Sequence, residues 1–196
     1  MYKIKSFFIA VFAVFLFSVI YSNCSILGVD YEEVRYRAGN YHNELIVPGS
    51  NLSEKLKWVE QNSKKGGNFI IEVYQNENIN SHTFVNSYGN YVTISLQGIG
   101  GNRRIYTNDS NYLFQLGRNV TLILNSNITL AGNNQDRGVV NIFEGNLIMN
   151  NGAAITGNTG GSGVYISRTT SSGGTFTMNG GIISGNSGGY YGGGVM

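Results

Sequence analysis

The chain has 196 residues, of which 41% are hydrophobic and only 12% are charged, with 28 glycines and a single proline. Disordered chains are usually poor in apolar residues and rich in charge or proline, so this composition argues against disorder and favours a domain with a real core. The formal net charge of +2 provides no electrostatic case for a nucleic-acid partner, and none is expected.

The amino-terminal residues have the layout of an export signal. Two lysines precede an apolar run from Phe7 to Ile20, and a short polar stretch then leads to Cys24. A cationic start, an apolar centre and a polar cleavage region are typical of signal peptides. The run has about 14 residues, fewer than the roughly 20 that span a bilayer. We therefore expect residues 1–23 to be a signal peptide and not a transmembrane anchor.

Cys24 is the single cysteine of the chain, so no intramolecular disulfide can form. Its place after the apolar run resembles the lipobox cysteine of bacterial lipoproteins, which is acylated and becomes the mature amino terminus. Tyr21 stands where that pattern has Leu, and Asn23 where it has Gly or Ala. The resemblance implies lipidation of Cys24 and a membrane partner reached through the lipid; ordinary secretion with a free thiol is the alternative. Residues 24–50 lack clear periodicity and are expected to form a tether.

Residues 51–65 carry the one convincing helix pattern. Asn51 can cap the helix, and Glu54 completes a capping-box-like pattern three residues later. An apolar stripe follows at i, i+4 and i+7, formed by Leu52, Leu56 and Val59. Two glycines after Lys65 end the pattern. A short amphipathic helix ahead of a long β region is suited to cover an open sheet end.

Residues 66–196 consist of short strand-like segments and turns that repeat. Aligning YVTISLQG, NVTLILNS, GNLIMNNG and GTFTMNGG produces three columns: Ile94, Leu122, Leu147 and Phe176; Leu96, Leu124, Met149 and Met178; and Gln97, Asn125, Asn150 and Asn179. A second block, LAGN, ITGN and ISGN, produces three more: Leu130, Ile155 and Ile183; Gly132, Gly157 and Gly185; and Asn133, Asn158 and Asn186. The first-column residues are 28, 25 and 29 positions apart, a period typical of a solenoid.

The repeat predicts stacked coils. Because residues alternate across a strand, Phe176 and Met178 are expected to face inward, and Thr175 and Thr177 outward. One such rung cannot bury its apolar face alone, but coils about 4.8 Å apart form a continuous core. Glycines permit the corners between short strands, and asparagine amides can form ladders from rung to rung. The predicted fold class is an all-β solenoid, a parallel β-helix with an amino-terminal capping helix.

The segment GTFTMNGGIISGN resembles the glycine-rich repeats of bacterial surface proteins that have a right-handed, pectate-lyase-like β-helix. Phe176 and Asn179 match the F-x-x-N signature of polymorphic outer-membrane protein repeats. The order NLSEKLKWVE, GGNFIIEV, VTISLQG and NVTLILNSNITLAGN resembles a recurrent module of spirochaete surface lipoproteins. The resemblance covers residues 51–196 and implies a right-handed β-helix, lipid-anchored at the cell surface or outer membrane. It implies little about activity.

No catalytic or metal-binding constellation is recognisable, so we expect no enzymatic activity, metal or cofactor. Polysaccharide-cleaving β-helices need clustered carboxylates, whereas from Gly138 onward the only acid is Glu144 and the only base is Arg168. His42 and His82 lack metal-ligand spacing and are expected at the surface. Three functions stay open: display of polar ladders for adhesion to host or matrix proteins or glycans, a structural spacer without ligand, and a carbohydrate-binding or carbohydrate-degrading relative.

The final coil is predicted to be incomplete. GGYYGGGVM stops at Met196, at the point where the parallel segment GSGVYIS continues as a strand through Ser167. No helix or charged segment follows it in this sequence, whereas natural solenoids end in polar terminal repeats. We therefore expect a shortened member of a longer family, or self-association or docking of a partner through the open carboxyl-terminal coil.

The lipoprotein interpretation predicts the effect of one substitution. If Cys24 carries the lipid, the mature protein partitions into detergent and Cys24→Ala releases it into the soluble fraction. Phase partitioning of wild type and variant measures this. Unchanged membrane association of the variant contradicts lipidation.

Overall fold

The computed structural model describes residues 44–85, 89–167, 173–188 and 192–196. The predicted signal peptide, Cys24 and His42 lie outside the described residues. The strands are β1 (Glu44–Ile46), β2 (Gly67–Val73), β3 (Glu77–Asn78), β4 (His82–Phe84), β5 (Val92–Gly98), β6 (Arg103–Tyr106), β7 (Phe114–Leu116), β8 (Val120–Leu124), β9 (Ile128–Ala131), β10 (Gly138–Ile142), β11 (Asn146–Met149), β12 (Ala153–Thr156), β13 (Ser162–Ile166), β14 (Thr175–Met178) and β15 (Ile182–Ser184). The helix α2 (Leu52–Asn62) continues into a 3₁₀ turn, η2 (Ser63–Lys65).

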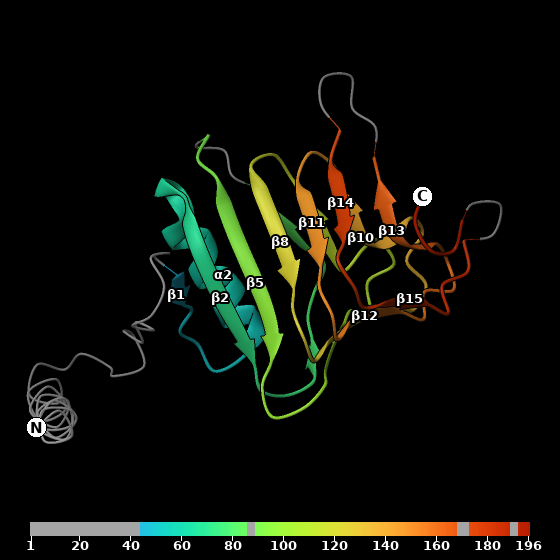
Figure 1. The fold of residues 1–196 in the computed structure, drawn as a ribbon, viewed down its shortest axis with the longest axis horizontal. Helices are drawn as coiled ribbons and strands as arrows, with labels where there is room; N and C mark the ends of the chain where they lie inside the picture. Colours follow the sequence, from blue (N-terminus) through green and yellow to red (C-terminus); the bar gives the residue numbers. More distant parts are fainter. Residues whose placement is uncertain (1–43, 86–88, 168–172, 189–191) are drawn as a thin grey trace, which may run out of the picture. The chain divides into compact units, whose positions relative to one another are not determined.

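The strands form three parallel sheets. Sheet A has the order β1-β2-β5-β8-β11-β14, sheet B the order β3-β6-β9-β12-β15, and sheet C the order β4-β7-β10-β13. From β2 onward the chain visits sheets A, B and C in turn; each of the first four rounds adds one strand to each sheet, and the fifth adds β14 to sheet A and β15 to sheet B (Figure 1). This arrangement is a β-solenoid of about five coils and confirms the predicted parallel β-helix.

The strand register confirms the predicted inward columns and extends them by one coil. In sheet A the first column is Phe69, Ile94, Leu122, Leu147 and Phe176, and the second is Ile71, Leu96, Leu124, Met149 and Met178. In sheet B the inward column is Ile105, Leu130, Ile155 and Ile183. Central members of these columns are 0% exposed, as Leu122 and Leu130 show. Each coil therefore buries its apolar residues against the coils before and after it.

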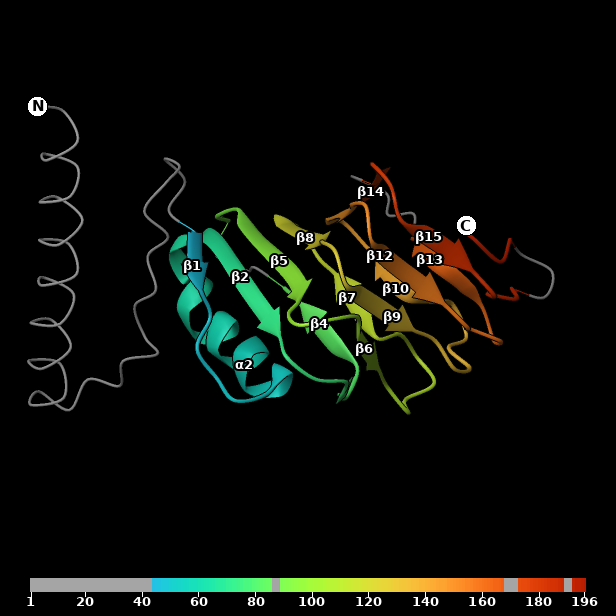
Figure 2. The same ribbon diagram turned by 60° about the horizontal axis from the view of Figure 1, so that its bottom comes forward.

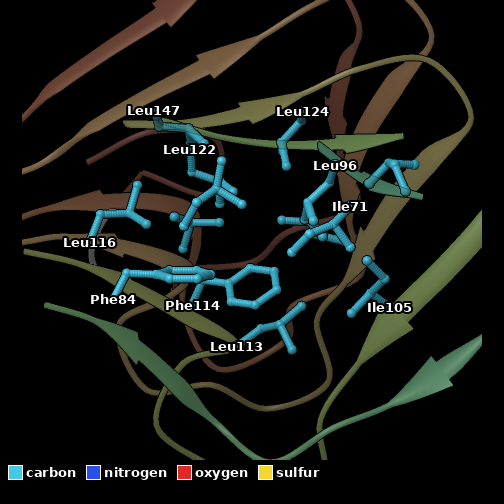
Figure 3. Close-up of a cluster of buried hydrophobic side chains, with 14 of the residues drawn as sticks. Ile71, Phe84, Leu96, Ile105, Leu113, Phe114, Leu116, Leu122, Leu124 and Leu147 are labelled. Atoms are coloured by element: carbon cyan, nitrogen blue, oxygen red, sulfur yellow. The ribbon is translucent and has the colours of Figure 1, made fainter. Parts of the chain in front are cut away.

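Sheet C completes the core with a third set of inward residues. Its columns contain Phe114, Val140 and Val164, and Phe84, Leu116, Ile142 and Ile166. The rings of Phe84 and Phe114 lie next to each other, with centroids 5.5 Å apart. Figure 3 shows these two rings among Leu113, Leu116 and the leucines of sheet A. The three sheets thus enclose one continuous hydrophobic interior.

The predicted helix covers the amino-terminal end of the solenoid (Figure 2). The Asn51 side chain accepts a hydrogen bond from the Glu54 backbone N–H at 2.9 Å, the predicted cap. The Glu54 carboxylate in turn accepts from the Ser50 N–H at 2.8 Å. The predicted stripe faces the core and is at most 2% exposed: Leu52, Leu56 and Val59. Gly66, with φ of 78°, ends the helical segment in a conformation that favours glycine.

Residues 44–50, which the sequence assigned to the predicted tether, are folded against sheet A. Strand β1 pairs with β2 at the edge of sheet A, and the Val47 N–H donates to the Ile70 carbonyl at 2.8 Å. Val47 is 1% exposed and belongs to the core. Residues 44–50 are therefore part of the folded domain. A three-residue strand is too short to show a period of two, which is why its pattern was not visible in the sequence.

Asparagine side chains form hydrogen bonds with the backbone at the corners between sheets B and C. Asn158 is fully buried, and its Oδ1 accepts from the N–H groups of Gln135 at 2.8 Å and Gly160 at 3.2 Å. Its Nδ2 donates to the carbonyls of Gln135 and Ser162, both at 3.0 Å. In the next coil, Asn186 Oδ1 accepts from the Asn158 N–H at 3.0 Å. Asn158 and Asn186, two members of the asparagine column seen in the repeats, thus satisfy backbone groups that the turns leave without a ladder partner.

The fifth coil is less covered than the others. Phe176 and Met178 occupy the inward columns, as predicted, yet Met178 is 48% exposed. Ile182 of β15, which pairs with the outward Ala154, is 61% exposed at the surface, whereas the inward Ile183 is half-buried. The chain then bridges β13 through Val195 and Val164. Within the described residues β14 and β15 are the last strands of their sheets, so this end of the core has no further coil packed on it.

The inward and outward positions predict where substitution by alanine lowers the free energy of unfolding. Leu147→Ala removes a fully buried side chain and should lower the free energy of unfolding by about 2–5 kcal/mol. Thr177→Ala changes an exposed outward residue and should change it by less than about 0.5 kcal/mol. Urea denaturation of both variants measures the difference. Equal losses contradict the inward and outward assignment.

Candidate interaction face on sheet A

The outer face of sheet A presents three rows of side chains that run across the coils. The strand register aligns Asn68, Thr93, Thr121, Asn146 and Thr175 in the first row; Ile70, Ser95, Ile123, Ile148 and Thr177 in the second; and Glu72, Gln97, Asn125, Asn150 and Asn179 in the third. We call this surface the ladder face. Two hydrogen-bonding rows therefore flank a central row of β-branched residues and one serine.

The third row is a ladder of amide hydrogen bonds. Asn179 Nδ2 donates to Asn150 Oδ1 at 3.0 Å, and Asn150 Nδ2 donates to Asn125 Oδ1 at 2.9 Å. Gln97 Nε2 lies 3.5 Å from Glu72 Oε1. Each of these donors points toward the amino-terminal coil. The predicted column therefore forms the expected ladder from Asn125 to Asn179, and Gln97 of the same row lies next to the Glu72 carboxylate.

The first row forms a second, shorter ladder that sequence reasoning missed. Thr175 Oγ1 donates to Asn146 Oδ1 at 2.6 Å, and Asn146 Nδ2 donates to Thr121 Oγ1 at 3.2 Å. The signal was present in the alignment, because each repeat carries Thr or Asn one position before its first inward residue. The two parallel ladders orient six polar side chains of the last three coils: Thr121, Asn125, Asn146, Asn150, Thr175 and Asn179.

Glu72 is the only charged residue of the ladder face, whose fifteen positions all lie in the described part of the chain. It is 7% exposed. The Tyr74 hydroxyl donates to its Oε2 at 2.5 Å. Lys55 Nζ donates to the Glu72 carbonyl at 2.8 Å and lies 5.1 Å from the centre of the Tyr74 ring. The carboxylate is thus held at the capped end of the row, and the rest of the face is electrically neutral.

The ladders leave hydrogen-bonding capacity for a ligand. An asparagine amide has two donor hydrogens and an oxygen with two lone pairs. The ladder bonds of Asn150 use one donor and one acceptor position. The remaining donor and lone pair of each amide repeat at the coil spacing of about 4.8 Å. This arrangement is suited to a neutral molecule with regularly spaced polar groups.

Two acidic residues of the described chain, Glu144 and Asp109, have structural partners. The Glu144 carboxylate accepts from Arg118 Nε at 3.1 Å and from its Nη2 at 3.2 Å, which ties two coils together. Asp109 Oδ2 accepts from the Ser81 N–H at 2.6 Å, and this bond lowers the pKa of the carboxyl group. Across the described residues no group of three or more His, Cys, Asp or Glu side chains gathers where it could hold a metal ion.

The His82 side chain faces the core from sheet C, so the expectation of a surface histidine was wrong. It occupies the inward column of sheet C opposite Phe114, its side chain is 16% exposed, and its ring stands edge-on to Phe84 with centroids 4.5 Å apart. Nε2 is buried without a hydrogen-bond partner. Glu60 Oε1 of α2 lies 3.6 Å from it, too far for a hydrogen bond. Burial lowers the pKa of His82 from 6.5 to about 4. The flanking polar residues hid this inward position in the sequence.

Comparison of the chain with family models, curated proteins and solved structures gives no match. Among the described residues no helix is long and apolar enough to cross a membrane.

The position of His82 predicts acid-sensitive stability. Its pKa is about 4 in the folded state and near 6.5 in an unfolded chain. The unfolded state therefore binds more protons between these values, so stability present above pH 6.5 is lost as the pH falls toward 4, by up to about 3 kcal/mol. Urea midpoints at pH 7 and pH 4.5 measure the loss.

The matched variant for this test is His82→Leu, which keeps an apolar inward side chain and cannot titrate. The free energy of unfolding of this variant should fall less between pH 7 and pH 4.5 than that of the wild type, because only the wild type has a histidine here that takes up a proton on unfolding. Glu60→Gln should enlarge the loss, since it removes the carboxylate nearest to the protonated ring. Identical pH profiles for wild type and His82→Leu contradict the argument.

Proposed function

We propose that this chain is an exported, lipid-anchored surface protein whose ladder face mediates adhesion to uncharged host or matrix molecules. The lipid anchor rests on Cys24 and its place after an apolar run. The adhesive role rests on one observation, the nearly neutral face on which amide and hydroxyl groups are aligned by hydrogen bonds over successive coils. No catalytic step is part of the proposal.

The regular spacing of the ladders favours an extended ligand. Each coil contributes one weak polar contact at most per row, so a single sugar ring or peptide unit gains little. A polymer that lies along the rows makes the same contact repeatedly, and linked contacts raise the overall affinity far above that of one site. Glycans and extended polypeptides of the extracellular matrix have the repeated hydroxyl or amide groups that this arrangement can bind.

The central row adds apolar contact between the two ladders. Ile123 and Ile148 are half-buried on the outer face and leave part of their aliphatic surface accessible. A ligand that covers them removes this surface from water, which is worth about 25 cal/mol per Å². Polar rims around a small apolar strip are a common composition for a binding surface.

The low charge of the face sets the class of partner. Glu72 is its only charge and is 7% exposed, so the face has no electrostatic attraction for sulfated glycans, acidic proteins or phosphate groups. Binding should therefore depend little on salt, because no counterions are released when a neutral ligand docks.

An array of glycans and matrix proteins tests the proposal. We expect wild-type protein to bind neutral members of the array with little change between 50 mM and 500 mM salt. Ile123→Lys places a charge in the middle of the ladder face and should weaken binding at least tenfold, because the ligand would have to desolvate an ammonium group without a partner.

The matched control is Ala154→Lys, which introduces the same charge at an outward, half-buried position of sheet B. It should bind like the wild type, provided that thermal unfolding shows both variants folded. Equal weakening in both variants places the binding elsewhere. Absence of any neutral ligand from the array favours a structural spacer, and cleavage of an array glycan favours the carbohydrate-degrading alternative.

A further inference from the structure

The outer edge of β14 has backbone groups that no described strand binds. The Thr175 N–H donates to the Gly145 carbonyl at 3.0 Å, and the Asn179 N–H donates to the Met149 carbonyl at 2.8 Å. Backbone groups of successive strand residues point to opposite sides. The N–H and C=O groups of Phe176 and Met178 therefore point away from β11, toward the open edge, and within the described residues no strand follows β14 in sheet A.

The side chains of this edge are also uncovered. Met178 is 48% exposed although it faces the core side, and Phe176 is only half-buried. Natural proteins protect such edges with charged residues or proline. From Gly173 to Met196 the sequence has no charged residue and no proline. The edge therefore lacks the usual features that prevent pairing with another strand.

The other end of the solenoid cannot serve as the complementary surface. There α2 packs its apolar stripe inward, and the charged residues Lys57, Glu60 and Lys64 are exposed. A head-to-tail contact would bury such charges against the apolar edge of β14, which is costly without partners. The surface that best complements the uncharged edge is the same edge of a second copy.

We propose that two copies of this chain associate tail to tail, with the two β14 strands paired antiparallel around a two-fold axis at Thr177. This register places Phe176 of one copy opposite Met178 of the other, so the inward side chains of both copies remain on the core side. A shift by one residue would turn them to the outer face. A two-fold contact of this kind is closed, so it yields dimers and not fibres.

The register uses the free backbone groups. Phe176 and Met178 direct their N–H and C=O groups to the edge, so they form hydrogen-bonded pairs across the axis. Thr177 directs its own groups to β11, so the two Thr177 residues form a non-hydrogen-bonded pair with Cα atoms about 4.5 Å apart. The sulfur of Met178 also comes near the ring of Phe176 in the second copy, a favourable contact. The dimer joins two ladder faces and is independent of the proposed adhesion.

Disulfide trapping tests the register. In a Cys24→Ser background, Thr177→Cys places two thiols at a separation that a disulfide can bridge. Under mild oxidation we expect most of the protein to migrate at twice the 21.3 kDa of the chain. Ser95→Cys, an outward residue in the middle of the same face, is the control and should remain monomeric on a non-reducing gel. Equal cross-linking of the two variants, or none at position 177, overturns the proposed register.

A charge at the edge tests the dimer itself. Met178→Lys brings two ammonium groups into the contact and should raise the dimer dissociation constant at least a hundredfold, as measured by analytical ultracentrifugation. Asn108→Lys adds the same charge in an exposed turn and should dimerise like the wild type. All proteins are compared in one mild detergent, so any effect of the apolar amino-terminal residues is common to them. A monomeric wild type, or an unchanged dimer of Met178→Lys, overturns the proposal.

Discussion

Parallel stacking of coils in one register is the constraint on which the rest of this structure depends. A single coil exposes its apolar residues on both open sides, so no coil is stable without a neighbour. Position i of one strand lies directly against the equivalent position of the next, as in the series Ile94, Leu122 and Leu147. A polar residue at such a position would be buried without a partner, which is why the inward columns are apolar throughout the central coils.

The same stacking organises the polar residues. Outward side chains of equivalent positions come within hydrogen-bonding distance, so an asparagine or threonine meets its counterpart in the next coil and forms a ladder. At the corners the chain leaves the sheets, and Asn158 satisfies the backbone groups exposed there from a fully buried position. The ladders and the corner asparagines therefore arise from one geometric repeat, although one set faces solvent and the other lies in the interior.

The two ends of the solenoid differ in whether other elements cover the hydrophobic core. At the amino-terminal end, β1 adds a strand to sheet A and α2 covers the interior with its apolar stripe. At the carboxyl-terminal end, the segment from Gly173 to Met196 has no charged side chain, and the inward Met178 is 48% exposed. This difference is the reason for placing the proposed self-association at the edge of β14, whereas the proposed adhesion uses the ladder face along the side.

The sequence by itself determined the repeat, the inward columns of sheets A and B, the asparagine ladder and the capping helix, because these features recur at fixed positions or have a clear helical period. Only the tertiary structure decided the burial of His82, the pairing of β1, and the arrangement of sheet C. Strands β1 and β4 have three residues each, too few to define a period, and the turns before the strands of sheet C vary in length. Their environment depends on which residues of distant coils lie against them, and that is a property of the stack and not of the local sequence.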